Sequence, residues 1–131
     1  MYGWERHLIR SIGLDIVEIS RIRQDISQFG DRFVRRILGE KERSIYDRHQ
    51  NKETFLAGRF AAKEAVIKGL NPFLQERPSL NVIQIINDSS GAPKLTLPPD
   101  IQQRLGSAVC LLSLTHERNY AAAVAIFAEE K

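Results

Sequence analysis

Residues 53–70, ETFLAGRFAAKEAVIKGL, predict one long helix that restricts the possible folds more than any other segment. Alanine, leucine, lysine and glutamate recur in it, and all four favour helix. At 100° per residue, its large apolar side chains fall on one broad arc: Phe55, Leu56, Phe60, Val66, Ile67 and Leu70. A helix with such an arc buries it against other elements, so the rest of the chain must supply a core around this helix.

Charged residues interrupt this apolar arc. Lys63 lies near its middle and Arg59 within it, while Glu64 lies at its rim and Lys68 one turn further on. A buried cation without an anionic partner is costly because it loses its water shell. The long stems could instead carry their charged heads to water, and Glu64–Lys68 could be a simple i,i+4 pair. The alternative is a helix that lines a cleft for a multiply charged anion, with Glu64 available to a metal ion.

The other segments predict an α+β protein. Period-2 and helical patterns indicate a strand at 8–17, helices at 19–29 and 31–38, an ambiguous polar stretch at 40–51, strands at 80–86 and 94–97, a helix at 100–107, and strands at 109–115 and 120–127. We expect a small, largely antiparallel sheet packed against a long helix and short helices. The length of 131 residues fits a single domain spanning residues 1–131.

Composition excludes several classes of protein. One cysteine excludes an internal disulfide and a cysteine-rich zinc site. No run of about 18 apolar residues predicts a membrane span, and charges at residues 5–7 interrupt the apolar stretch that a signal peptide needs. We expect a soluble, cytoplasmic domain. Its net charge of +3 comes from residues 1–60, which hold 12 Lys/Arg and 9 Asp/Glu. A nucleic-acid-binding module is the alternative, although basic strands interleaved with aromatic residues are missing.

Two further segments carry polar residues at positions suited to chemistry. Asp15 interrupts the apolar strand GLDIV, so it is either solvated on an open sheet face or meets another charge. Together with Glu64 it would supply the one or two carboxylates that commonly hold Mg²⁺. His116 ends the apolar strand Leu112-Ser-Leu-Thr-His116, where a histidine is either a structural hydrogen-bonding residue or a catalyst.

Three segments in a fixed order resemble the short, bacterial-type holo-acyl-carrier-protein synthases, a branch of the 4′-phosphopantetheinyl transferases. They are GLDIVEISRI at 13–22, FLAGRFAAKEAVIK at 55–68, and LSLTH at 112–116 followed by YAAAV at 120–124. The turn at Gly91-Ala-Pro93 matches as well. The second segment is quite specific, and together the matches extend over nearly the whole chain.

The resemblance implies a reaction, a cofactor and an assembly. Members of the family transfer 4′-phosphopantetheine from coenzyme A to a serine of apo-acyl carrier protein, which leaves adenosine 3′,5′-bisphosphate and supports fatty acid or polyketide biosynthesis. They use Mg²⁺, and the short branch generally forms homotrimers with active sites between subunits. An inactive structural subunit of such a trimer is a further alternative, which the retained acidic and basic site residues oppose.

The resemblance also assigns roles to individual residues. Asp15 and Glu64 correspond to the metal carboxylates, and Arg21 lies on the first helix, where the acidic carrier protein docks. The cofactor-binding positions are Arg59, Lys63 and Lys68 near the phosphates of coenzyme A, His116 in the same region and Pro93 near the adenine. The catalytic set implied is Asp15, Glu64, Lys68 and His116. A metal-bound water, Asp15, Glu64 or His116 could accept the serine proton.

The chain departs from the family's pattern in two places. The segment after Lys68, residues 69–73, lacks the usual glycine-bearing loop, so we expect its contacts to coenzyme A to differ. Gly39 stands where threonine is common, and Glu42 nearby is an additional candidate for a metal ligand or a base.

Overall fold

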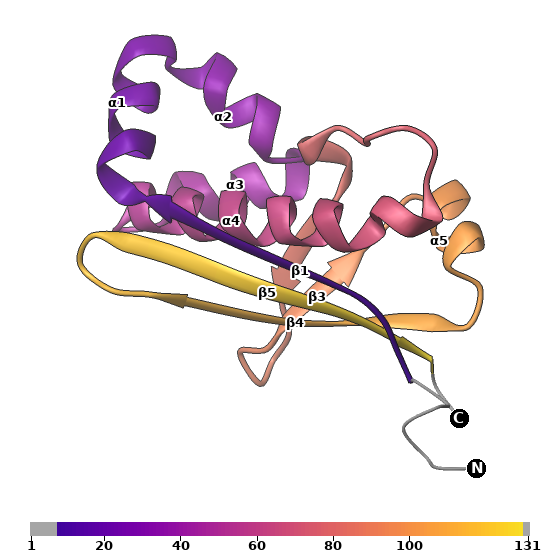
Figure 1. Ribbon diagram of the computed structural model, residues 1–131. Coiled ribbons are helices and arrows are strands. Elements are labelled where there is room, and N and C mark those ends of the chain that lie inside the picture. The colour runs from indigo at the N-terminus through magenta and orange to yellow at the C-terminus, as the bar shows by residue number, and fades with distance from the viewer. Residues whose placement is uncertain (1–7, 130–131) are drawn as a thin grey trace, which may run out of the picture.

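A long helix lies across one face of a three-stranded antiparallel sheet in the computed structural model, which describes residues 8–129 (Figure 1). The helix is α4 (Lys52–Leu70), and the sheet has the strand order β1 (Ile9–Glu18), β5 (Tyr120–Glu129), β4 (Ala108–His116). A separate hairpin of β2 (Gln84–Asn87) and β3 (Pro93–Thr96) lies beside β4. This architecture confirms the predicted α+β class and its antiparallel sheet.

Three short helices cover the side of α4 that faces away from the sheet (Figure 1). They are α1 (Ile19–Phe29), α2 (Asp31–Ile37) and α3 (Glu40–Arg48). Elsewhere, helix α5 (Pro99–Leu105) precedes β4, and two short 3-10 turns are η2 (Asn71–Phe73) and η3 (Leu80–Val82). Because α4 lies between two layers, it is buried on more faces than its apolar arc predicts. Eleven of its residues are buried, Arg59 and Lys63 among them.

Small residues let α4 approach the sheet closely. A Cβ added to Gly13 of β1 would lie 1.8 Å from the carbonyl oxygen of Ala65, and one added to Gly69 would lie 2.4 Å from the ring of Phe127. The alanines of β5 that face the helix, at positions 121, 123 and 125, are also buried. The contact between α4 and the sheet therefore depends on backbone-to-backbone proximity, which fixes the polar side chains on either side of it.

The two faces of the sheet differ in exposure. On β1, Gly13, Asp15 and Val17 face the helix, whereas Ile12, Leu14 and Ile16 point outward and are 58%, 63% and 65% exposed. The period-2 pattern therefore predicts the strand correctly, but the apolar side of that pattern lies on the open face. In the antiparallel register, Ile12 pairs with Ile126, which pairs with Leu111, so apolar side chains cross all three strands.

The ambiguous stretch 40–51 forms helix α3 over residues 40–48. One local prediction needs revision. The strand predicted from residue 80 begins at Gln84, because residues 80–82 form the turn η3, closed by a hydrogen bond from the Ile83 N–H to the Leu80 carbonyl. Among the described residues, no helix has both the length and the apolar character needed to cross a membrane.

Candidate functional site

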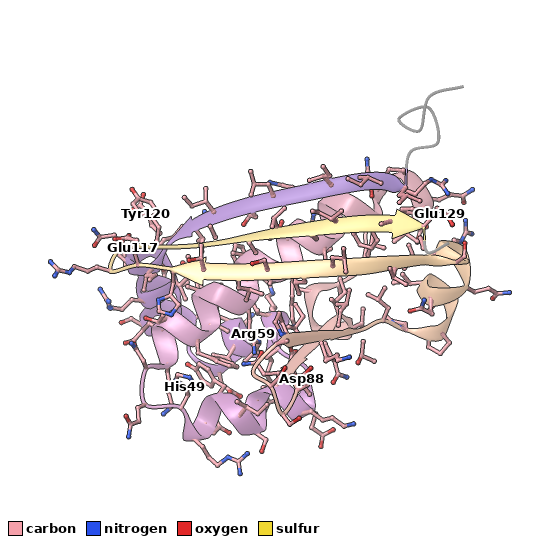
Figure 2. All side chains as sticks on the ribbon, turned by 90° about the horizontal axis from the view of Figure 1, so that it is seen from below. His49, Arg59, Asp88, Glu117, Tyr120 and Glu129 are labelled. Atoms are coloured by element: carbon pink, nitrogen blue, oxygen red, sulfur yellow. The ribbon has the colours of Figure 1, made fainter. Side chains whose placement is uncertain are left out.

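A cleft of about 490 Å³ lies at the β4 edge of the sheet and brings together three of the predicted cofactor-binding residues. Arg59 comes from α4, Pro93 from the hairpin and His116 from the end of β4, and all three line it. Figure 2 shows Arg59 and His49 beyond β4, on the side away from β1. The fold therefore brings these distant segments together at one cleft.

Arg59 is fixed in the wall of this cleft although it is only 7% exposed. Its Nε–H donates to the Ile85 carbonyl at 3.1 Å, a terminal N–H donates to Asn87 Oδ1 at 3.3 Å, and its guanidinium lies 4.7 Å from the centre of the Phe55 ring. Burial lowers the pKa of Arg59, and the charge of Glu42 offsets part of that effect. A buried guanidinium held by neutral groups favours an anion in the adjoining space.

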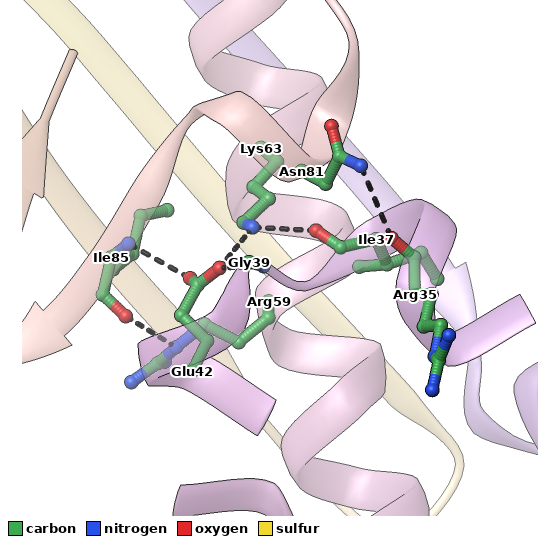
Figure 3. Close-up of polar contacts among 8 residues, drawn as sticks. All are labelled: Arg35, Ile37, Gly39, Glu42, Arg59, Lys63, Asn81 and Ile85. Atoms are coloured by element: carbon green, nitrogen blue, oxygen red, sulfur yellow. Dashed lines mark hydrogen bonds and ion pairs between the residues drawn. The ribbon is translucent and has the colours of Figure 1, made fainter. Parts of the chain in front are cut away.

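Lys63 does not reach the cleft, contrary to its predicted contact with coenzyme A. Its side chain is fully buried, and its ammonium donates to Glu42 Oε1 and to the Ile37 carbonyl, both at 2.5 Å (Figure 3). Burial lowers the Lys63 pKa, and the Glu42 carboxylate offsets part of that effect. We therefore assign Lys63 to the core, because a fully buried ammonium cannot contact a ligand at the surface.

Glu42 is correspondingly a structural residue rather than a metal ligand or base. Its carboxylate is fully buried and accepts the backbone N–H groups of Gly39 at 2.9 Å and Ile85 at 2.8 Å, in addition to the Lys63 ammonium. The charge within the apolar arc correctly indicates that Lys63 needs an anionic partner. It does not say which acid supplies it, since Glu42 is 21 residues away on another helix.

The remaining predicted residues lie on the β1 side of α4. Lys68 donates to Asp15 Oδ1 at 3.1 Å and to the Leu14 carbonyl at 2.8 Å. Glu64, one turn earlier on α4, accepts a hydrogen bond at 2.6 Å from Arg77. Asp15 is thus paired with the charge of Lys68. This agrees with the interpretation that Asp15 meets another charge and not with the one in which it is only solvated.

Asp15 and Glu64 are chemically suited to a hard divalent cation. Their side chains are only 16% and 17% exposed, and each carboxylate is neutralised by one basic side chain that is more than half exposed. The positive ends of Lys68 and Arg77 therefore stand where a cation would bind. Residues four apart on a helix share a face, so Lys68, which contacts Asp15, lies on the same face of α4 as Glu64. Residues 8–129 contain no cluster of three or more potential ligands among His, Cys, Asp and Glu, and Mg²⁺ needs only one or two carboxylates.

The two groups of site residues lie toward opposite edges of the sheet. Asp15 is on β1 and His116 is on β4, and β5 runs between them. Lys68 lines a second cavity of about 250 Å³, which it shares with Arg77, and none of the residues that line it belongs to the larger cleft. Within a single protomer, the carboxylate pair Asp15 and Glu64 is therefore separate from the cleft that Arg59 lines.

Other residues complete this description. Arg21 is exposed on α1, where a partner could contact it. His49 and Asn87 line the larger cleft but are absent from the predicted set; the position of Asn87 at the end of a strand, just before the turn at 88–93, is the sequence signal that could have identified it. Burial raises the pKa of the Cys110 thiol to about 12, so this cysteine is an unreactive part of the sheet.

Comparison with known proteins supports one family over nearly the whole chain. Residues 11–125 match the model of the 4′-phosphopantetheinyl transferase superfamily. A holo-[acyl-carrier-protein] synthase from Klebsiella pneumoniae is 40% identical over 121 residues, covering 90% of this chain and 96% of that relative. The crystal structure of the Neisseria meningitidis holo-[acyl-carrier-protein] synthase is similar with a TM-score of 0.84 and 31% identity, covering 92% of this chain and 99% of that one. The Helicobacter pylori synthase in complex with coenzyme A gives a TM-score of 0.79 and 30% identity, covering 89% and 99%.

Proposed function

Because the chain belongs to the 4′-phosphopantetheinyl transferase superfamily, we propose that its two groups of site residues divide the work of one transfer reaction. The activity is that of a holo-acyl-carrier-protein synthase, which transfers 4′-phosphopantetheine from coenzyme A to apo-acyl carrier protein and so supports fatty acid biosynthesis. The finer proposals concern which residues bind coenzyme A, the metal ion and the carrier protein.

The larger cleft binds the nucleotide end of coenzyme A. Arg59 contacts a phosphate, His116 lies in the same region and Pro93 packs near the adenine. The observation that carries this proposal is the buried guanidinium of Arg59, which is held by the Ile85 carbonyl and the Asn87 amide and adjoins open space. Because the protein fixes this charge before the ligand arrives, little side-chain entropy is lost when a phosphate binds.

Asp15 and Glu64 hold Mg²⁺. When bound, this ion polarises the pyrophosphate of coenzyme A and neutralises the charge that develops during transfer. Lys68, released from Asp15, complements the departing phosphate. Asp15, Glu64 and His116 are the side chains that could accept the serine proton, and the pH dependence of kcat/KM in single variants separates them.

The proposed assembly is a homotrimer whose active sites lie between subunits. Two observations support it. The carboxylate pair and the Arg59 cleft lie toward opposite edges of one sheet. The outer face of that sheet also exposes apolar side chains on both edge strands, with Leu111 of β4 59% exposed and paired through Ile126 of β5 with Ile12 of β1, and surfaces of this kind commonly mark protein–protein contacts.

The carrier protein docks on α1. Arg21 is exposed there, and the excess of basic residues within residues 1–60 favours encounter with an acidic partner. A cytoplasmic location stays a prediction, which fractionation of cells that produce the chain would test.

The direct test incubates the purified protein with coenzyme A, Mg²⁺ and an apo-acyl carrier protein and weighs the carrier by intact mass spectrometry. We expect the mass of the carrier to rise by one phosphopantetheine arm, and this gain to disappear when the metal ion is chelated. The variant Glu64→Ala should abolish the gain and leave the circular dichroism spectrum unchanged. No gain with several carriers would instead favour a binding role, and titration with coenzyme A would then measure it.

A further inference from the structure

Arg77 lies in the segment between η2 and η3, just after residues 69–73, where the chain departs from the family's pattern. This segment runs from η2 to η3 and passes the end of α4, and from it Arg77 donates a hydrogen bond to Glu64 Oε1 at 2.6 Å. An arginine that pairs with a proposed metal ligand needs an explanation, because a cation at Glu64 competes directly with the metal ion.

The contacts around this end of α4 form two similar pairs. Lys68 neutralises Asp15 and Arg77 neutralises Glu64. The two acids are 16% and 17% exposed, whereas Lys68 and Arg77 are 53% and 58% exposed. The acids are thus held in place by the fold, while the basic side chains are long and largely surrounded by water. Breaking such a pair costs little, since ion pairs whose basic side chain is surrounded by water contribute little to stability.

The two basic residues also share a space for a ligand. Lys68 and Arg77 both line the smaller cavity of about 250 Å³, together with polar side chains that include Asn71 and Gln75. If a divalent cation occupies the two carboxylates, both basic groups lose their partners and lie beside a positive ion. They then need an anion, and the pyrophosphate of coenzyme A, which the proposed function brings to the metal ion, supplies one.

We propose that Arg77 binds a phosphate of coenzyme A, and that it pairs with Glu64 until the metal ion binds there. The proposal rests on the metal site of the proposed function. Guanidinium keeps its charge at all relevant pH values and can bind two phosphate oxygens at once. Exchange of partners at Glu64 therefore couples the two ligands: the metal ion releases Arg77, and Arg77 adds to the affinity for coenzyme A. Such coupling is reciprocal, so coenzyme A also tightens metal binding.

The test measures both ligands by isothermal titration calorimetry in the wild-type chain and in Arg77→Gln. Without coenzyme A, the variant should bind Mg²⁺ about two- to five-fold more tightly, because Glu64 has no competing cation, a change of the size expected for an exposed ion pair. With saturating Mg²⁺, the same variant should bind coenzyme A about ten-fold more weakly, because a charged hydrogen bond to phosphate is lost. These opposite shifts distinguish the proposal from a general loss of structure, which would weaken both.

Two controls accompany this measurement. Arg77→Lys keeps the charge without the two-pronged donor and should fall between the wild type and Arg77→Gln in its affinity for coenzyme A. Arg104→Gln removes an exposed arginine from α5 and should change neither affinity. Glu64→Gln should abolish measurable Mg²⁺ binding.

The outcomes distinguish the proposed role of Arg77 from the proposed metal site on which it rests. If Mg²⁺ binding does not depend on Glu64, the proposed metal site is wrong and the role of Arg77 falls with it. If Mg²⁺ binding does depend on Glu64 but Arg77→Gln binds coenzyme A as tightly as the wild type, the metal site stands and Arg77 is only a surface partner of Glu64.

Discussion

Glu42 and Lys63 connect the interior of the protein to the cleft through one residue of β2. The Ile85 N–H donates to the Glu42 carboxylate, and the Ile85 carbonyl accepts from Arg59 (Figure 3). The buried ion pair therefore helps to place the guanidinium that faces the cleft. Such pairs gain little net stability because both charges lose water, yet removing one partner is costly because it leaves the other charge uncompensated.

Replacement of Lys63 by methionine should therefore destabilise the fold strongly. We expect Lys63→Met to lower the free energy of unfolding by about 3–5 kcal/mol, because the Glu42 charge stays buried without its partner. Lys68→Met, on the same helix but in an exposed pair, should cost about 1 kcal/mol or less. Urea denaturation followed by circular dichroism measures both.

A double variant tests the cause of this loss. Glu42→Gln combined with Lys63→Met removes both charges and keeps an amide oxygen for the Ile85 N–H, so it should recover most of the lost stability. If Lys63→Met is no more destabilising than Lys68→Met, the charge of Glu42 is not the reason that Lys63 is needed.

At the scale of elements, the contact between β1 and α4 sets the position of the carboxylate pair. Gly13 lies against the backbone of Ala65, and two residues further along β1, Asp15 meets Lys68 of the same helix. A wider gap between strand and helix would separate Asp15 from the turn of α4 that carries Glu64 and Lys68. The position of the carboxylate pair thus depends on Gly13, whose missing side chain allows the close contact.

Substitution of Gly13 by alanine tests this dependence. The added Cβ would lie 1.8 Å from the Ala65 carbonyl oxygen, and backbone on both sides leaves little room to adjust. We expect Gly13→Ala to destabilise by about 1–3 kcal/mol or more and to weaken Mg²⁺ binding. Gly58→Ala is the matched control, since its Cβ would meet only the Leu114 side chain, at 3.9 Å. It should stabilise α4 by up to about 1 kcal/mol. Equal stabilities of the two variants in urea denaturation would contradict the model of a close contact.

The sequence predicted most elements because their patterns are local. Gly30 ends α1 with a φ of 60°, as its position after the helical repeat indicates, and the small-residue strand 120–127 lies at the centre of the sheet. The first part of strand 80–86 was predicted wrongly, because β-branched residues do not reveal that a hydrogen bond closes a turn there.

Within the candidate site, the sequence predicted residue types better than contacts. It identified Arg59 and His116, which meet at one cleft, and Asp15, whose charge is paired. It could not assign Lys63 to Glu42 or find Arg77, because both partners come from segments whose distance from α4 depends on the tertiary fold. The outward direction of Ile12, Leu14 and Ile16 was equally hidden, since alternation does not say which side of a strand is covered.

At the scale of the whole molecule, the proposed site residues of one protomer lie toward two edges of its sheet. Arg59 and His116 face a cleft at the β4 edge, whereas Asp15 and its partner Lys68 lie at the β1 edge. In a ring of identical subunits, each contact joins one surface to a different surface of the next subunit. Such a ring can bring the β1 edge of one protomer to the β4 edge of its neighbour, and three protomers would then form three complete sites.

Complementation between two inactive variants tests this arrangement. Glu64→Gln removes a proposed metal ligand and Arg59→Ala removes the cleft guanidinium, so each homotrimer should be inactive. When the two chains are co-expressed with different tags and purified as mixed trimers, some sites combine an intact β1 edge from one chain with an intact cleft from the other. In a ring of two chains of one variant and one of the other, one of the three contacts joins an intact β1 edge to an intact cleft, so we expect mixed trimers to have up to about a third of the wild-type transfer activity. The two variants purified separately and then mixed without subunit exchange should stay inactive. Light scattering gives the number of chains in each species, and mixed trimers without activity would place each complete site within a single chain.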